Sequence, residues 1–361
     1  MSRKNTYFYH DKPLFGLDIG NGSLKVMQVS DHATSGEFGT NHKLIGYGTA
    51  VFDKSAIEEG VLVKPEIIAK AMLELFKKGL VGDITSRRVA VTIPAYRTFT
   101  RNISLPKLGN DELDEAVRVE AEQYIPMPLE DLYLDYQIIS QTNEASEVFA
   151  VAVPRKIVDS YLELANILGL EAILIETTLN ASARLFAQDA QSSIPAVIID
   201  FGSLSADISI FDKQVLVTGT VQGGGENFTN SIEKKLGVSH EEAGLIKTRY
   251  GLSASKRQTE IVQALEPTLK EIIKEIHRMV RYYEERYGTD NPINQVITLG
   301  GGANMPGLTD YLTSALRLAV RRCEPWQYID SGHLKPPAQA DKPMFATVAG
   351  LSVSNYKELF S

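Results

Sequence analysis

Two stretches of the chain repeat one pattern of apolar and polar positions: an apolar run, a short polar turn and a second apolar run. They are LFGLDIGNGSLKVMQV (14–29) and AVIIDFGSLSADISIF (196–211). The turns carry aspartate, glycine and serine at one spacing, as Asp18, Gly20 and Ser23 in the first and as Asp200, Gly202 and Ser205 in the second. Each stretch predicts a β-hairpin, because glycine permits the positive φ of a tight turn. The repeat predicts two similar halves whose hairpin tips face each other across a cleft.

Over the rest of the chain, helical spacing of apolar residues alternates with short apolar runs, which is typical of an α/β protein. Amphipathic helices are predicted over 64–79, 226–237, 239–250, 258–288 and 306–320. Pro267 interrupts the fourth of these patterns, and we expect it to bend that helix or to start it afresh, because proline lacks a backbone donor and clashes with the preceding turn.

Residues 94–170 break this alternation. Their pattern predicts a strand, a helix, two strands and a second helix, which together make a small α+β unit inserted into the first half. The unit contains no group of titratable residues at catalytic spacing. Two interpretations stay open for it: a partner-binding module, or structural packing alone.

The paired hairpin tips have the chemistry of a nucleoside triphosphate site. Asp18 and Asp200 can hold a hydrated Mg²⁺, which prefers one or two carboxylates together with substrate phosphates. Glycine backbone and the Ser23 hydroxyl can approach phosphate oxygens, and Lys25 can add a point charge. One such turn alone is explained by local turn chemistry, whereas two turns at matched spacing favour the nucleotide hypothesis.

Two further glycine clusters point the same way. Residues 223–225 precede the predicted helix at 226–237, and residues 300–302 end an apolar strand shortly before the helix predicted at Pro306. Backbone without side chains can pass close to a phosphate or a flat base, and a helix N-terminus favours negative charge.

Composition excludes several other classes. The net charge of −8 and the pI near 5.4 argue against a nucleic-acid surface, which needs a basic stripe. The single cysteine, Cys323, cannot form an internal disulfide, so nothing indicates an oxidising compartment. No run of about 18 apolar residues occurs, and the first residues show no secretion signal, so we expect a cytoplasmic protein without a membrane span.

Taken together, the order of these motifs resembles the actin-like ATPase superfamily, which includes actin, sugar kinases, heat-shock chaperones and the division protein FtsA. Within it, the segments EAEQYIPMPLEDLYLDYQII (120–139) and KEIHRMVRYYEE (274–285) are similar to the PilM family of type IV pilus assembly proteins. The resemblance extends from about residue 14 to residue 351. It implies an α/β, ribonuclease H-like fold of two lobes with an inserted α+β subdomain.

The resemblance also implies domain limits. Lobe 1 would comprise residues 14–93, 171–195 and 344–361, and lobe 2 would comprise residues 196–343 with a helical subdomain at about 226–288. The inserted, partner-binding subdomain would occupy residues 94–170.

Site residues follow from the same resemblance. Asp18 and Asp200 would organise Mg²⁺ beside ATP. The phosphates would be bound by Gly20, Asn21, Gly22, Ser23, Lys25, Gly202 and Ser203. The nucleoside would be bound by Gly224, Gly225, Lys247, Gly301, Gly302 and Asn304. Glu176 would face the γ-phosphate and orient a water molecule, although it is equally explained as a charge that favours a helix N-terminus.

One position departs from the superfamily pattern. The helix at 239–250 usually carries a glutamate three residues before its nucleotide-binding lysine, and here Gly244 stands at that place before Lys247. Glu241 or Glu242 could substitute, but Glu242 also suits a capping box with Ser239. This departure therefore affects the predicted contact between the protein and the ribose of the nucleotide.

By resemblance, the chain would be an ATP-binding scaffold at the cytoplasmic face of the inner membrane, and at most a slow ATPase. It would bind the cytoplasmic N-terminal tail of a PilN-like inner-membrane pilus protein in a nucleotide-dependent way. Pilus motor ATPases and further copies of the chain are other candidate partners. Two alternatives stay open: an FtsA-like filament-forming division protein, and a small-molecule kinase, for which the sequence offers no positioned base or polar substrate pocket.

Overall fold

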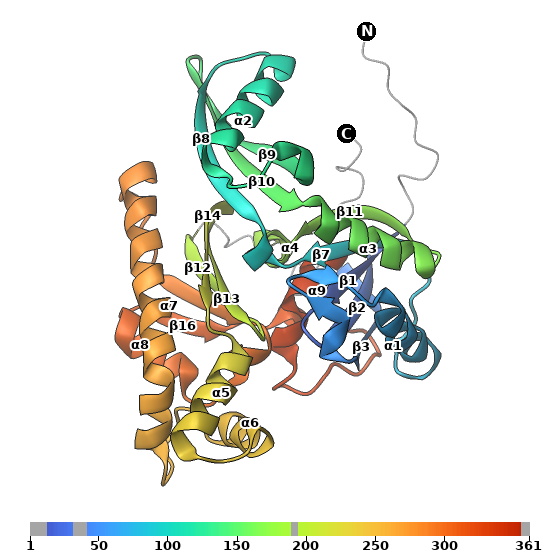
Figure 1. Cartoon of the computed structure of the whole chain (residues 1–361), viewed down its shortest axis with the longest axis vertical. Helices are drawn as coiled ribbons and strands as arrows, with labels where there is room; N and C mark the ends of the chain where they lie inside the picture. Colours follow the sequence, from blue (N-terminus) through green and yellow to red (C-terminus); the bar gives the residue numbers. More distant parts are fainter. Residues whose placement is uncertain (1–12, 32–41, 189–193, 355–361) are drawn as a thin grey trace.

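The computed structural model describes residues 13–31, 42–188 and 194–354. These residues form two α/β lobes and a smaller inserted subdomain; in Figure 1 lobe 1 lies to the right, lobe 2 to the left and the inserted subdomain at the top. The parts of lobe 1 predicted at 189–193 and 355–361 lie outside the described residues. Among the helices of the described part, none is both long and apolar enough to cross a bilayer.

Lobe 1 is built on a six-stranded mixed sheet. Its strand order is β11-β7-β1-β2-β3-β6. The strands are β1 (Phe15–Ile19), β2 (Ser23–Asp31), β3 (His42–Val51), β6 (Val81–Gly82), β7 (Arg88–Ile93) and β11 (Glu171–Thr177). A small ribbon of β4 (Ile57–Glu58) and β5 (Val61–Leu62) follows the short 3₁₀ helix Lys54–Ala56. β1 and β2 form the first predicted hairpin, in which Asp18 stands opposite Lys25.

One face of this sheet is covered by α1 (Pro65–Lys78) and α3 (Arg155–Ile167). Pro65 begins α1 at a position where a helix needs no backbone donor. The sequence pattern predicts α3 as the second helix of the inserted unit. In the structure its buried residues Ile157, Tyr161 and Leu164 pack with α1 and the sheet of lobe 1, so the packing of this helix belongs to lobe 1.

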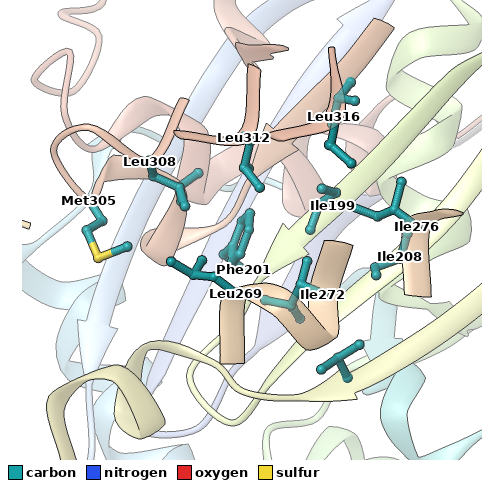
Figure 2. Packing of buried hydrophobic residues seen from close by; sticks show 14 of the residues in the cluster. Ile199, Phe201, Ile208, Leu269, Ile272, Ile276, Met305, Leu308, Leu312 and Leu316 are labelled. Atoms are coloured by element: carbon teal, nitrogen blue, oxygen red, sulfur yellow. The ribbon is translucent and has the colours of Figure 1, made fainter. Parts of the chain in front are cut away.

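Lobe 2 is built on a five-stranded sheet of order β14-β13-β12-β15-β16. The strands are β12 (Ala196–Phe201), β13 (Ser205–Asp212), β14 (Gln214–Gln222), β15 (Gln295–Leu299) and β16 (Ala319–Arg322). Its helices are α5 (Gly225–Leu236), α6 (His240–Arg249), α7 (Gln258–Tyr287) and α8 (Leu308–Leu316). Figure 2 shows the core between the sheet and α7 and α8, where Phe201 is surrounded by leucine and isoleucine side chains and is fully buried.

We expected Pro267 either to bend this helix or to start a new one. The second alternative is wrong, because α7 runs unbroken from Gln258 to Tyr287 with Pro267 inside it. Pro267 lies on the exposed face, where a carbonyl that loses its partner can bond to water. Leu265 and Leu269, on either side of it, are fully buried. Burial of the face that carries these leucines therefore outweighs the free-energy cost of a proline inside the helix.

The two lobes share a core. α4 (Thr178–Ala187) and α9 (Ala346–Ser352) pack against each other between the sheets. Their buried residues Phe186 and Val348 contact a cluster that includes Met27 of lobe 1 and Ile198 of lobe 2. This shared core joins the lobes at one end and leaves the two hairpin tips to form the opposite walls of a cleft.

The inserted subdomain is a three-stranded antiparallel sheet of order β8-β10-β9 with α2 (Asn110–Tyr124) on one face. Its strands are β8 (Phe99–Pro106), β9 (Leu132–Gln141) and β10 (Ala145–Pro154). The subdomain contacts lobe 2 through Phe149 of β10, which is buried in one cluster with Val215 of β14, and through polar groups. The Asn102 side-chain amide donates to the Leu216 carbonyl at 2.5 Å and to the Tyr287 hydroxyl at 3.0 Å, and Arg286 forms an ion pair with Glu147.

Candidate functional site

A cavity of about 640 Å³ lies between the lobes, and both hairpin turns line it. Most of the predicted site residues are on its wall: Asp18, Gly20, Asn21, Ser23, Lys25, Asp200, Gly202, Ser203, Gly225, Lys247, Gly301, Gly302 and Asn304. Three predicted residues, Gly22, Gly224 and Glu176, are not among the lining residues. The cavity is therefore the place where residues far apart in the sequence are brought together.

The two hairpins are related in structure as well as in sequence, and this relation identifies an acidic residue that sequence analysis missed. β12 pairs with β13 so that Asp200 stands opposite Asp207, just as Asp18 stands opposite Lys25 in lobe 1. The two hairpins thus bring three aspartates and one lysine to the cavity wall. The constant separation in sequence that maps Asp18 onto Asp200 also maps Lys25 onto Asp207. This correspondence is the sequence signal from which Asp207 could have been predicted as a site residue.

These carboxylates differ in their partners. Asp18 accepts hydrogen bonds from Lys25 Nζ at 3.1 Å and from Thr92 Oγ1 at 2.9 Å. Burial, together with the charges of Asp207 and Asp18, raises the pKa of Asp200 to about 7, and Lys25 only partly offsets this. Asp200 is consequently the carboxylate in this group that gains most from a bound cation.

Asp207 is held on both oxygens. It accepts from Thr220 Oγ1 at 2.7 Å and from Ser205 Oγ at 3.2 Å. Burial raises the pKa of Asp207 to about 6, although both hydrogen bonds act in the opposite direction. Asp200 and Asp207 therefore both bind their protons more tightly in the folded chain than in the unfolded chain.

This pair predicts a pH-dependent stability. Between about pH 4 and pH 7 the folded state of the nucleotide-free protein keeps protons that the unfolded state has already released, so its free energy of unfolding falls as pH rises through this window. We expect Asp200→Asn to remove roughly 2–4 kcal/mol of that fall, a range that allows for screening by water in the cavity. Denaturant unfolding at several pH values measures it, and equal slopes for wild type and variant would contradict it.

Glycine is needed at the closest points of the cleft. Gly300 has a φ of +80°, and a Cβ there would lie 2.3 Å from Asp200 Oδ1. A Cβ on Gly302 would meet the Phe201 Cβ at 2.8 Å, whereas one on Gly301 would meet nothing within 4 Å. The strand end thus packs tightly against the aspartate turn and presents bare backbone at Gly301 to the cavity.

Gly224 and Gly22 have structural explanations. A Cβ on Gly224 would lie 2.5 Å from the Ser203 carbonyl, and the first amides of α5, those of Gly225 and Glu226, donate to the Gly202 and Ser203 carbonyls. Because these amides are used by the hairpin turn, they do not face the cavity as free donors. Gly22 adopts a φ of +110° in the first turn.

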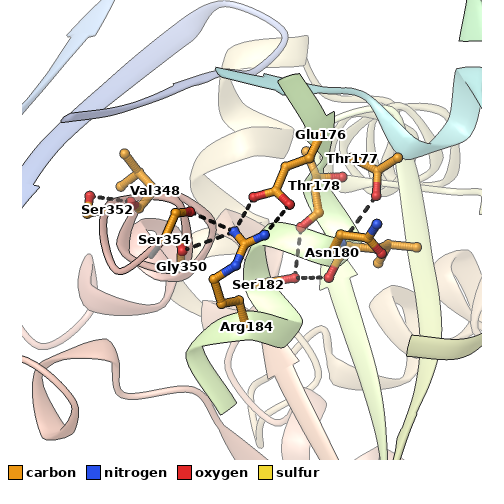
Figure 3. Close-up of polar contacts among 11 residues, drawn as sticks. Glu176, Thr177, Thr178, Asn180, Ser182, Arg184, Val348, Gly350, Ser352 and Ser354 are labelled. Atoms are coloured by element: carbon orange, nitrogen blue, oxygen red, sulfur yellow. Dashed lines mark hydrogen bonds and ion pairs between the residues drawn. The ribbon is translucent and has the colours of Figure 1, made fainter. Parts of the chain in front are cut away.

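Glu176 is bound to an arginine rather than directed into the cavity. Figure 3 shows its carboxylate in a bidentate pair with Arg184 of α4, in which Nη2 donates to Oε2 at 2.6 Å. Arg184 also donates to Ser354 Oγ at 2.9 Å. The predicted role in orienting water would require this pair to open. Thr178, two residues later, lines the cavity instead.

The nucleoside end of the cavity is formed by α5, α6 and the residues after β15. Lys247 Nζ donates to the Gly225 carbonyl at 2.6 Å and to Thr229 Oγ1 at 2.7 Å, and burial lowers the pKa of Lys247. Glu226, which sequence analysis did not select, also lines this end. Its carboxylate bonds across the cleft to Lys54 of lobe 1 at 3.0 Å.

The residues present fit a magnesium-bound nucleotide. Among the described residues, no group of three or more histidine, cysteine, aspartate or glutamate side chains could hold a metal by itself, but Mg²⁺ needs only one or two carboxylates when phosphates supply the rest. Within the described part of the chain, Asn304 Oδ1 and Thr178 Oγ1 are buried at the cavity without a hydrogen-bond partner. Such atoms are the ones that a polar ligand would satisfy.

Comparison with known proteins decides the family. Residues 16–356 match the model of a family described as the type IV pilus assembly protein PilM. The chain belongs to the PilM family. This confirms the resemblance stated from the sequence motifs.

Relatives and solved structures of this PilM-family chain agree on the fold. The cell division proteins FtsA of Enterococcus hirae and Enterococcus faecalis are 23% and 24% identical to it, over 86% and 82% of this chain and 78% and 74% of theirs. A structure described as a PilM-PilN type IV pilus biogenesis complex matches with a TM-score of 0.80 at 24% identity, covering 96% of this chain and 99% of that one. An MreB of Spiroplasma citri bound to AMPPNP matches with a TM-score of 0.52 at 12% identity, over 94% and 95% of the two chains. The predicted actin-like fold is confirmed.

Proposed function

We propose that this chain is an ATP-binding scaffold of type IV pilus assembly whose binding of a partner depends on the nucleotide. The observation that carries the proposal is the cavity itself, which is lined by two aspartate turns with the same sequence spacing and by bare glycine backbone. The fold is also that of an MreB protein whose structure contains AMPPNP.

The residues of the cavity have distinct parts in this proposal. Asp18 and Asp200 would hold Mg²⁺, which neutralises charge on the phosphates when it is bound. Lys25, fixed by Asp18, would contact the phosphates from lobe 1 together with residues 20–23, and Gly202 and Ser203 would contact them from lobe 2. Lys247, Gly225, Gly301, Gly302 and Asn304 would surround the nucleoside. Both lobes then bind one ligand, so its binding favours one relative position of the lobes.

The partner proposed is the cytoplasmic N-terminal tail of a PilN-like inner-membrane protein, which would hold this chain at the cytoplasmic face of the membrane. Support comes from the matched structure, which is described as a complex with PilN. The inserted subdomain is the proposed binding module. Its polar contacts with lobe 2 and the position of Tyr96, which lines the cavity just before β8, connect it to the nucleotide site. Motor ATPases and self-association are hypotheses that rest on the resemblance alone.

Hydrolysis is proposed to be slow. The one carboxylate predicted to orient water, Glu176, is paired with Arg184, and a site without a positioned water lacks the main contribution to phosphoryl transfer.

Calorimetric titration of ATP with Mg²⁺ into the full chain, with phosphate release followed in the same samples, tests this function. We expect saturable binding of one nucleotide and turnover far below the ~1–100 s⁻¹ of typical kinases. Absence of binding would contradict the nucleotide site, and turnover in the kinase range would favour an enzyme instead of a scaffold.

A further inference from the structure

Gly244 leaves α6 without the carboxylate that the superfamily pattern places one turn before Lys247. The site has room for one, because the nearest neighbour of a Cβ on Gly244 would be the Thr229 methyl group at 4.0 Å. The candidates weighed from the sequence, Glu241 and Glu242, are not among the residues that line the described cavity. Glu242 lies in the first turn of α6, where its backbone amide donates to Ser239 Oγ at 3.2 Å.

Glu226 brings a carboxylate to the same end of the cavity from another helix. It follows Gly225 at the start of α5 and lines the cavity together with Lys247. Lys247 joins α6 to α5 at this point through its bonds to Gly225 and Thr229. Thr229 is also the nearest neighbour of Gly244. The carboxylate of Glu226 and the missing one at position 244 therefore belong to one corner of the site.

The Glu226 carboxylate is held from two sides. Lys54 Nζ of lobe 1 lies 3.0 Å from Oε2, and His240 Nε2 lies 3.2 Å from Oε1. The hydrogen bond from Lys54 lowers the pKa of Glu226, so the group is an anion that can only accept hydrogen bonds. Its side chain keeps 29% of its surface exposed. Ligand donors can thus still reach it.

An anionic acceptor on this wall selects which part of a nucleotide lies beside it. Phosphates are repelled by it and are attracted to Lys25 and bound Mg²⁺ at the hairpin tips. The ribose contributes two hydroxyl donors between the phosphates and the base, and a carboxylate accepts such a pair well. The base is left for the bare backbone at Gly301 and the unpartnered Asn304 Oδ1.

We propose that Glu226 accepts hydrogen bonds from the ribose hydroxyls of the bound nucleotide and so replaces the glutamate absent at position 244; this inference rests on the proposed nucleotide-binding function. Lys54 orients the acceptor from the opposite lobe, so the ribose contact lies where the two lobes are joined by this ion pair.

The test compares binding of ATP, 2′-deoxy-ATP and 3′-deoxy-ATP, each with Mg²⁺, to the full chain. For wild type we expect each deoxy nucleotide to bind roughly tenfold or more weakly than ATP, since each loses a hydrogen bond to a charged group. In Glu226→Ala the ratio should fall close to one. The matched control is Glu233→Ala, which removes the same charge from the same helix and the other partner of His240, at 2.9 Å, without touching the cavity wall. It should keep the wild-type ratio.

A rescue variant guards against indirect effects of Glu226→Ala on folding. Adding Gly244→Glu to it places a carboxylate at the superfamily position and should restore part of the discrimination. The proposal is overturned if wild type does not discriminate, or if Glu226→Ala keeps the wild-type ratio. Failure of wild type to bind ATP at all is a different result, because it contradicts the nucleotide function and this inference together.

Discussion

Replacing Asp200 by asparagine is expected to weaken Mg-ATP binding by roughly a hundredfold to a thousandfold, about 3–4 kcal/mol. Asp200 lies at the tip of the lobe 2 hairpin, where burial, together with the charges of Asp207 and Asp18, raises its pKa to about 7 in the free protein. A bound cation removes this repulsion, so metal and carboxylate stabilise each other. Asparagine has nearly the same shape but cannot supply the charge. Calorimetry with and without Mg²⁺ measures the loss.

The same variant should be at least as stable as wild type when no nucleotide is present, because it removes a repelled, buried charge. This opposite sign separates a binding role from a structural one. Asp310→Asn, on the exposed surface of α8 in the same lobe, is the matched control and should bind Mg-ATP as wild type does. A destabilised Asp200→Asn with unchanged affinity would show that the aspartate serves the fold and not the ligand.

Arg184→Met is expected to lower the free energy of unfolding by about 3–5 kcal/mol. Only 9% of the Glu176 side chain is exposed, and its carboxylate would be left buried without the guanidinium that pairs with both oxygens. The arginine also bonds to Ser354 just after α9, so the change loosens the shared core between the lobes (Figure 3). Denaturant unfolding followed by tryptophan fluorescence, with the single Trp326 as reporter, measures the effect.

The double variant Glu176→Gln with Arg184→Met should regain most of this stability, because no uncompensated charge remains. Glu176→Gln alone separates the two roles considered for this residue. If Glu176 opens from Arg184 to orient water, the rate of ATP hydrolysis per bound nucleotide should fall in that variant. If the pair is structural, turnover should stay as in wild type while stability falls.

The two hairpins could be predicted from the sequence because their chemistry is local and repeated. An apolar run that ends in aspartate and glycine specifies its own turn, and the constant spacing between the two copies predicts two similar halves whose tips face each other across a cleft. The sequence also showed that position 244 lacks a carboxylate. These features depend on short segments, and short segments carry most of the information about turns and helix starts.

Other features could not be read from the sequence because they depend on contacts between distant residues. The capture of Glu176 by Arg184 requires that the strand end, α4 and the segment after α9 meet. The packing of α3 on lobe 1 requires knowledge of which sheet lies beneath it. Glu226 was missed because an acid in the first turn of a helix is usually explained by the helix dipole. Lys54, its partner, lies in the other lobe.

Binding of a labelled peptide, corresponding to the cytoplasmic N-terminal segment of the PilN protein from the same organism, tests the central claim most directly. Its affinity for the full chain is compared without nucleotide and with saturating Mg-ATP, in wild type and in Asp200→Asn. The account predicts that Mg-ATP changes the affinity of wild type by at least about fivefold, the lower end of ordinary allosteric coupling, and leaves that of Asp200→Asn unchanged. Equal affinity of wild type for the peptide in both conditions would contradict a nucleotide-dependent scaffold.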